Sequence, residues 1–227
     1  FNRAPISLSI LSCLLVMYAK HTTSEHLSCV VCEPGTYCFN DDSFTCPTHS
    51  SSPQNSGNIS SCQCLPGYFK QDQGGGVHTC EPCPANSYCF EDYVFECPLY
   101  SVSVVLSSAV TDCKCQQGYH GVITSVSDLN ACQACPVGTF KSQVGEGVCE
   151  ACAVGTYAET EANDASTDCL ACPEHSTSSS GSDEASDCLC VAGYEDSGTV
   201  GELICSICDS GFYSSSAGTV CEACPTA

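Results

Sequence analysis

The chain has 227 residues, of which 25 are cysteine and none is tryptophan, and its 26 Asp and Glu residues outweigh five Lys and Arg to give a formal net charge of −21. A surface this acidic repels phosphate, which excludes nucleic acid as a partner. Cysteine at this density predicts small modules held by disulfides, and an oxidising compartment. We therefore expect an extracellular or cell-surface protein.

The first segment, residues 1–23, has two interpretations. Its uncharged apolar run resembles a secretory signal peptide. Alternatively, Ile6, Leu8 and Ile10 alternate with serines, a period that predicts an assembly strand able to pair with a sheet edge of a neighbouring subunit. The run is shorter than the roughly 20 residues of a spanning helix, and we expect no membrane span in this sequence.

From Cys29 onward the cysteines recur as C-x-x-C and C-x-C pairs. A 51-residue period relates residues 29–80 to residues 81–132. The period carries Tyr37 and Phe44 onto Tyr88 and Phe95, so the side chains repeat with the cysteines. One structural unit used twice in series is the expected result.

The cysteine order within each of these two modules resembles an epidermal-growth-factor-like (EGF-like) domain, although its third interval is longer. That resemblance implies pairing of first with third, second with fourth and fifth with sixth cysteine. The implied bridges are Cys32–Cys46, Cys38–Cys62 and Cys64–Cys80, followed by Cys83–Cys97, Cys89–Cys113 and Cys115–Cys132. Six cysteines allow many other connectivities, so the resemblance alone supports this choice.

The spacing shortens after Cys132. Gly138-Thr139-Phe140 and Gly155-Thr156-Tyr157, each following a C-x-x-C pair, resemble the cysteine-rich region of ephrin-type receptors and the related tumour-necrosis-factor-receptor-like repeats. We expect short units at 133–172, a C-x-C unit with a Gly-Tyr motif at 173–205 and a partial unit at 206–227. Simple serial pairing predicts Cys135–Cys149, Cys152–Cys169, Cys172–Cys188, Cys190–Cys205 and Cys208–Cys221. It leaves Cys224 to pair beyond Ala227, and Cys29 with Cys13 as its nearest candidate.

The predicted fold is an elongated series of small disulfide-rich modules in tandem, with sparse short β-hairpins and little helix. Hairpins are expected near Tyr68, Tyr119 and Tyr194, because each follows a glycine that permits a tight turn. Further strands are expected at 101–106 and 122–126, where β-branched residues are frequent.

Zinc is a competing explanation for the C-x-x-C pairs, since Cys149, Cys152, Cys169 and Cys172 have the spacing of a four-cysteine site. The overlapping use of each pair and the C-x-C variants favour disulfides instead. The histidines are isolated and no catalytic motif is present, so we expect neither an enzyme nor a cofactor. Calcium is weakly supported, because the acidic residues lack regular ligand spacing.

Asn58-Ile59-Ser60 is an N-glycosylation sequon in the long loop after Cys46. Our leading hypothesis is a secreted structural glycoprotein that forms an extracellular filament or surface coat. By resemblance, protist surface-fibre proteins such as tubular mastigoneme components are one setting for such modules. The alternative is the ectodomain of a cell-surface receptor or adhesion protein. The expected partners are copies of the chain or other extracellular proteins.

Overall fold

The computed structural model describes residues 17–21, 27–40, 42–74 and 77–225. The chain divides into two compact units. The first unit covers Phe1–Cys97 and Ser103–Cys113, and the second covers Pro98–Val102 and Lys114–Ala227.

The first unit contains ten short strands and two single-turn 3-10 helices among its described residues. They are β1 (Met17–His21), β2 (Leu27–Val31), β3 (Thr36–Phe39), β4 (Asp42–Thr45), β5 (Ser50–Ser51), η2 (Ile59–Ser61), β6 (Gln63–Cys64), β7 (Tyr68–Gly74), β8 (Val77–Pro82), β9 (Ser87–Phe90), β10 (Tyr93–Glu96) and η3 (Val110–Asp112).

The second unit continues the series with shorter strands. They are β11 (Ser101–Val102), β12 (Lys114–Cys115), β13 (Tyr119–His120), β14 (Gln133–Ala134), β15 (Thr139–Phe140), β16 (Glu150–Ala151), β17 (Thr156–Tyr157), η4 (Ser166–Asp168), β18 (Leu170–Ala171), β19 (Ser176–Thr177), η5 (Ala185–Asp187), β20 (Leu189–Cys190), β21 (Tyr194–Asp196), β22 (Cys205–Ile207), β23 (Phe212–Tyr213) and β24 (Glu222–Ala223).

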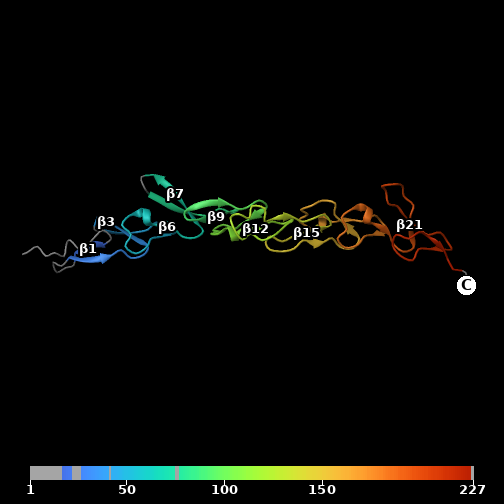
Figure 1. Cartoon of the computed structure of the whole chain (residues 1–227), viewed down its shortest axis with the longest axis horizontal. Helices are drawn as coiled ribbons and strands as arrows, with labels where there is room; N and C mark the ends of the chain where they lie inside the picture. The colour runs from blue at the N-terminus through green and yellow to red at the C-terminus, as the bar shows by residue number, and fades with distance from the viewer. Residues whose placement is uncertain (1–16, 22–26, 41, 75–76, 226–227) are drawn as a thin grey trace, which may run out of the picture. The chain divides into compact units, whose positions relative to one another are not determined.

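Each odd-numbered strand pairs antiparallel with the next strand, so every sheet of the described residues has two strands (Figure 1). This arrangement confirms the predicted fold class, a tandem series of small disulfide-rich modules with short hairpins and little helix. The hairpins near Tyr68, Tyr119 and Tyr194 are present as β7–β8, β13–β14 and β21–β22.

Two strand predictions from β-branched runs need correction. Residues 122–126 form a loop, closed because the Asp128 carboxylate accepts hydrogen bonds from the backbone N–H groups of Thr124 (2.9 Å) and Ser125 (2.8 Å). The strand expected at 101–106 ends at Val102, and the chain then turns at Leu106 with φ of 68°. Local hydrogen bonding and turn geometry thus override β-propensity at both places.

Cysteine supplies the core. Among the described residues, every buried hydrophobic side chain is a cysteine except Tyr88, Ile123 and Ala158. Modules this small cannot bury a large apolar surface, so disulfides that restrict the unfolded chain contribute much of the stability.

The same turn recurs three residues after a cysteine. The residues at these positions have positive φ: Gly35, His49, Gly67, Asn86, Tyr100, Gly118, Gly138, Gly155, His175, Gly193 and Gly211. For example, the Gly118 carbonyl accepts a hydrogen bond from the Cys135 N–H at 2.8 Å, and the Gly155 carbonyl accepts one from the Cys172 N–H at 2.9 Å. At six of the eleven turns the carbonyl accepts the N–H of the second cysteine of the next C-x-x-C pair, which places that pair against the turn.

At three of these turns an aromatic side chain replaces glycine and stacks on the tyrosine of the following Gly-Tyr motif. The pairs are His49–Tyr68, Tyr100–Tyr119 and His175–Tyr194, with ring centroids 4.3, 4.2 and 4.3 Å apart. Such stacking stabilises by about 0.5–1.5 kcal/mol beyond the area buried. It connects each loop to the hairpin after the next C-x-C pair.

Successive loops are held together by a recurring joint of two backbone hydrogen bonds. In one bond the carbonyl of a cysteine accepts the N–H of a positive-φ residue in the next loop, as in Ala162 to Cys135 at 2.9 Å. In the other, the turn residue three positions after that cysteine donates to the next loop, as in Gly138 to Ala158 at 2.8 Å. The joint occurs after Cys32, Cys83, Cys115, Cys135, Cys152 and Cys190. Disulfides close the loops, and these joints order them in series.

Candidate interaction surfaces

The disulfide framework corrects the pairing implied by the EGF-like resemblance. The structure joins Cys32 to Cys38 and Cys46 to Cys62, where the resemblance implies Cys32–Cys46 and Cys38–Cys62. The second module repeats the difference, with Cys83–Cys89 and Cys97–Cys113 in place of Cys83–Cys97 and Cys89–Cys113. The remaining bridges are Cys64–Cys80, Cys115–Cys132, Cys135–Cys149, Cys152–Cys169, Cys172–Cys188, Cys190–Cys205 and Cys208–Cys221.

The physical reason for the correction lies in the turn before β3. Gly35 has φ of 81° and the Thr36 N–H donates to the Glu33 carbonyl at 3.0 Å, so the chain reverses between Cys32 and β3, and Cys38 on β3 lies with its Cα 6.0 Å from that of Cys32. Cys46 follows β4 and begins a new loop that closes on Cys62. Each observed bridge therefore links two cysteines that are consecutive in the sequence, and no two bridges cross.

The competing zinc interpretation is excluded by the same bridges. Cys149, Cys152, Cys169 and Cys172 each form a disulfide, so their sulfurs are not available as thiolate ligands. Within the described residues, no group of three or more His, Cys, Asp or Glu side chains is arranged to hold a metal ion.

The remaining sites expected from the sequence have different outcomes. Asn58 is exposed and caps η2, where its side chain accepts the N–H of Ser60 at 2.9 Å. The assembly strand of Ile6, Leu8 and Ile10 lies outside the described residues, as does Cys13. Cys224 is exposed and has a free sulfur.

One face of the β9–β10 hairpin carries four aromatic rings that the sequence analysis did not identify as a surface. Tyr88 pairs with Phe95 across the strands, and Phe90 pairs with Tyr93. Because side chains alternate between the faces of a strand, these four residues share one face, which we call the aromatic hairpin face. Tyr88 is buried, but Phe90, Tyr93 and Phe95 are 56%, 69% and 42% exposed.

A smaller copy of this face occurs 51 residues earlier. On the β3–β4 hairpin, Tyr37 stacks on Phe44 with ring centroids 5.4 Å apart, and Phe39 is exposed. Asp42 stands where Tyr93 stands in the second module. The alternation of aromatic residues in both hairpins is the sequence signal that predicts such a face.

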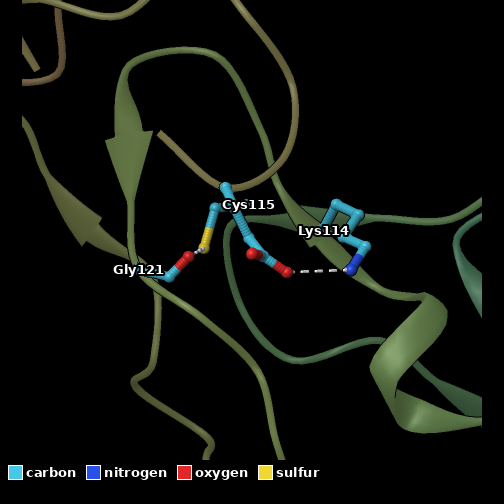
Figure 2. A network of polar contacts seen from close by, with 4 residues as sticks. Lys114, Cys115 and Gly121 are labelled. Carbon is cyan, nitrogen blue, oxygen red and sulfur yellow. Dashed lines mark hydrogen bonds and ion pairs between the residues drawn. The ribbon is translucent and has the colours of Figure 1, made fainter. Parts of the chain in front are cut away.

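The second unit is strongly acidic and its two lysines are engaged locally. Lys114 Nζ lies 3.3 Å from Glu146 Oε1 (Figure 2). The Cys115 sulfur in the same view approaches the Gly121 carbonyl oxygen at 3.5 Å, a packing contact because a disulfide sulfur has no proton to donate. Lys141 is 3% exposed and donates to the Gln143 carbonyl, and its burial lowers the pKa of its ammonium group.

An open groove of about 1390 Å³ lies in this second unit. Its walls are residues 183–186 and 188–190, residues 196 and 198–203 at the end of the β21–β22 hairpin, and residues 218–220. Five carboxylates line it, from Glu159, Asp183, Glu184, Asp196 and Glu202, together with apolar side chains. In the sequence these acidic residues lack the regular spacing of calcium ligands, and no groove was expected from them.

Comparisons with known proteins agree with a cysteine-rich repeat architecture. A family model described as tyrosine-protein kinase ephrin type A/B receptor-like matches residues 123–164. The chain is 30% identical over 155 residues to the Mus musculus protein named Sushi, von Willebrand factor type A, EGF and pentraxin domain-containing protein 1, a match that covers 65% of this chain. It is 27% identical over 215 residues, 83% of this chain, to Cysteine repeat modular protein A of Toxoplasma gondii.

These matches cover 4% and 6% of the two relatives, so the chain corresponds to a small part of each. What they share with it is the extracellular type of cysteine-rich repeat. In the described part of the chain, no helix is long and apolar enough to cross a membrane.

Proposed function

We propose that this cysteine-rich repeat protein is a secreted structural glycoprotein that assembles into an extracellular filament or coat, with the aromatic hairpin face as a contact between copies. The observation that supports the proposal is the exposure of Phe90, Tyr93 and Phe95 together on one face. Exposed apolar groups clustered in this way mark interaction sites on soluble proteins.

Two further features support a structural role. The joint repeated between successive loops provides order without a large core, which suits a protein built by adding modules. Asn58 is exposed at the N-cap of η2, so a glycan attached there would extend into solvent.

The proposal is tested by sedimentation and electron microscopy of the native protein and of a Phe90→Ser/Tyr93→Ser variant. Burying one aromatic ring contributes about 1.5–3 kcal/mol, so removing two rings weakens association by roughly 100-fold or more. Val148→Ser is the matched control, because Val148 is 82% exposed and belongs to the second unit. Uniform monomers under assembly conditions, or assembly by the double variant at native concentration, would refute the proposal.

The acidic groove favours a second candidate function, the ectodomain of a receptor or adhesion protein. Charged side chains in a groove can steer and orient a partner of opposite charge. A full-length transcript that encodes a spanning helix together with these repeats would favour this function, and secretion of the full-length product into the medium would oppose it.

A further inference from the structure

The acidic groove of the second unit combines a fixed shape with carboxylates that the unit does not neutralise. The tip of the β21–β22 hairpin is a tight turn, closed by a hydrogen bond of 2.9 Å from the Glu202 N–H to the Thr199 carbonyl. Gly201 at this tip has φ of 93°, which few other residues adopt. The turn holds Val200 and Glu202 in defined positions at the edge of the groove.

A second wall, which contains Asp183 and Glu184, is also ordered. The Asp187 carboxylate accepts the backbone N–H groups of Asp183 (3.1 Å) and Glu184 (3.4 Å), and this arrangement caps η5. The Glu159 carboxylate accepts the Ala185 N–H at 3.1 Å and so ties this wall to the preceding loop. Asp183 therefore projects from a backbone that is fixed at several points.

No basic side chain of the second unit neutralises the carboxylates of the groove. The second unit contains 16 of the 26 acidic residues and only two basic residues, Lys114 and Lys141. Lys114 pairs with Glu146 and Lys141 is buried, and neither lines the groove. Carboxylates that line one groove repel one another at low ionic strength, and a cationic group bound in the groove relieves that repulsion.

The groove also offers apolar contacts between its charged walls. Leu189 is 47% exposed, Val220 is 68% exposed and Val200 is fully exposed. Gly218 lies so near Leu189 that a Cβ added there would be 3.1 Å from Leu189 Cδ1, so Leu189 rests directly on backbone. Exposed apolar side chains on an ordered surface present a place for an apolar side chain of a partner.

We propose that this groove binds a basic segment of another extracellular protein, with Arg or Lys side chains against Asp183 and Glu202 and an apolar side chain against Leu189 and Val200. Charge complementarity identifies the partner: every charged side chain of the walls is a carboxylate, which accepts hydrogen bonds, and guanidinium and ammonium groups only donate them. A simple cation is a poorer match, because no cluster of three or more ligating side chains is found within the described residues. The inference does not depend on filament assembly.

The test uses the full chain with its disulfides intact and, as probe, a short synthetic peptide that alternates Arg and Leu. Binding is measured by isothermal titration calorimetry at about 50 mM and about 200 mM salt. We expect saturable one-to-one binding that weakens at the higher salt. A peptide with Glu in place of Arg is expected not to bind.

Two variants of equal net charge separate the groove from the general acidity of the chain. Asp183→Asn/Glu202→Gln is expected to weaken binding by about tenfold, since each substitution removes one charge contact. Asp209→Asn/Glu222→Gln changes two exposed carboxylates that do not line the groove, and is expected to change binding less than about twofold. Val200→Ser is expected to weaken binding at both salt concentrations, because an apolar contact is not screened.

Equal weakening by the two carboxylate variants would show non-specific attraction and overturn the proposal. So would unchanged binding by Val200→Ser, or absence of saturation at the lower salt. An unchanged disulfide map of every variant, obtained by peptide mapping without reduction, establishes that a weaker binder has kept its fold.

Discussion

Gly118 is a turn residue of the repeated joint at which two loops approach closely. It has φ of 76°, its N–H donates to the Lys141 carbonyl at 2.9 Å, and its carbonyl accepts the Cys135 N–H at 2.8 Å. A Cβ added here would lie closer than 3.0 Å to the Ala162 carbonyl oxygen, a backbone atom that cannot rotate away. Gly118→Ala therefore tests whether the close approach of loops at the joint is real.

Gly155 provides the matched comparison. It occupies the same turn position with φ of 83°, donates to Ser178 and accepts from Cys172. Its nearest neighbour for an added Cβ is the Thr177 hydroxyl at 3.7 Å, an ordinary contact. The two substitutions thus share the backbone cost of a positive φ and differ only in the clash.

The expected magnitudes follow from these contacts. Alanine in the left-handed region costs about 1–2 kcal/mol, and the loss of freedom in the unfolded chain offsets about 0.4–1 kcal/mol of this. Gly155→Ala should therefore destabilise by about 1 kcal/mol. The clash adds about 1–3 kcal/mol at Gly118, in the range found for overpacked sites. Ala162 would move, and its hydrogen bond to the Cys135 carbonyl would lengthen.

Amide hydrogen exchange followed by NMR measures this effect at the joint itself. In Gly118→Ala, exchange at the amides of Cys135 and Ala162 should accelerate. This acceleration should be roughly 5- to 150-fold larger than the acceleration at the corresponding amides in Gly155→Ala. Peptide mapping of both variants without reduction checks that the bridges are native. Equal acceleration in the two variants would refute the close approach, and the joint would then be only a loose contact.

Three further predictions concern single sites. Ala162 has φ of 60°, so Ala162→Gly should stabilise the folded chain by up to about 1 kcal/mol in a denaturation assay. Ala165 has φ of −145°, so Ala165→Gly should destabilise the chain by about 0.5–1 kcal/mol in the same assay. Hydrogen bonds from Thr124 lower the pKa of the Asp128 carboxyl, so the loop of residues 122–126 should keep its order above pH of about 4 and lose it as the pH falls through the pKa of the folded state. The amide chemical shifts of this loop should follow that change. Titration of Asp128 at or above the ordinary value would contradict the prediction. Replacing Cys32 and Cys38 together by alanine should leave every other bridge in place in a mass-spectrometric map, while scrambled bridges would oppose the short-loop pairing.

The hairpins could be predicted because their signals are local. A glycine before an aromatic residue permits the positive-φ turn, and the structure has such a turn before Tyr68, Tyr119 and Tyr194. The positive φ of His49, Tyr100 and His175 could not be predicted from residue type, since large side chains rarely adopt it. There the stacked tyrosine, and a hydrogen bond to the carbonyl from the N–H of the residue that follows the next C-x-C pair, stabilise an otherwise unfavourable backbone.

The groove could not be predicted for a different reason. Its walls come from segments separated by up to several loops, and the joints that bring them together are made by backbone atoms. Backbone hydrogen bonds leave little trace in residue type except where glycine is required. The exposed hairpin tip at Val200 and the acidic loop at Asp183 each have the composition of an ordinary polar turn.

The pairing error has a cause that is visible in the sequence once the loops are aligned differently. The 51-residue period groups six cysteines and favours the EGF-like comparison. However, the run Cys46-Pro47-x-His49-Ser50 also matches Cys172-Pro173-x-His175-Ser176, and both lead to a C-x-C pair and a Gly-Tyr motif. The structure closes the two loops alike, as Cys46–Cys62 and Cys172–Cys188. The loop from one cysteine to the next is thus the repeating element throughout, and the Cys32–Cys38 and Cys83–Cys89 bridges are short additions to it. Two later loops lack such a short bridge. In them Lys141 and Ala158 occupy the position that Cys38 and Cys89 occupy in the first two modules, and both are buried.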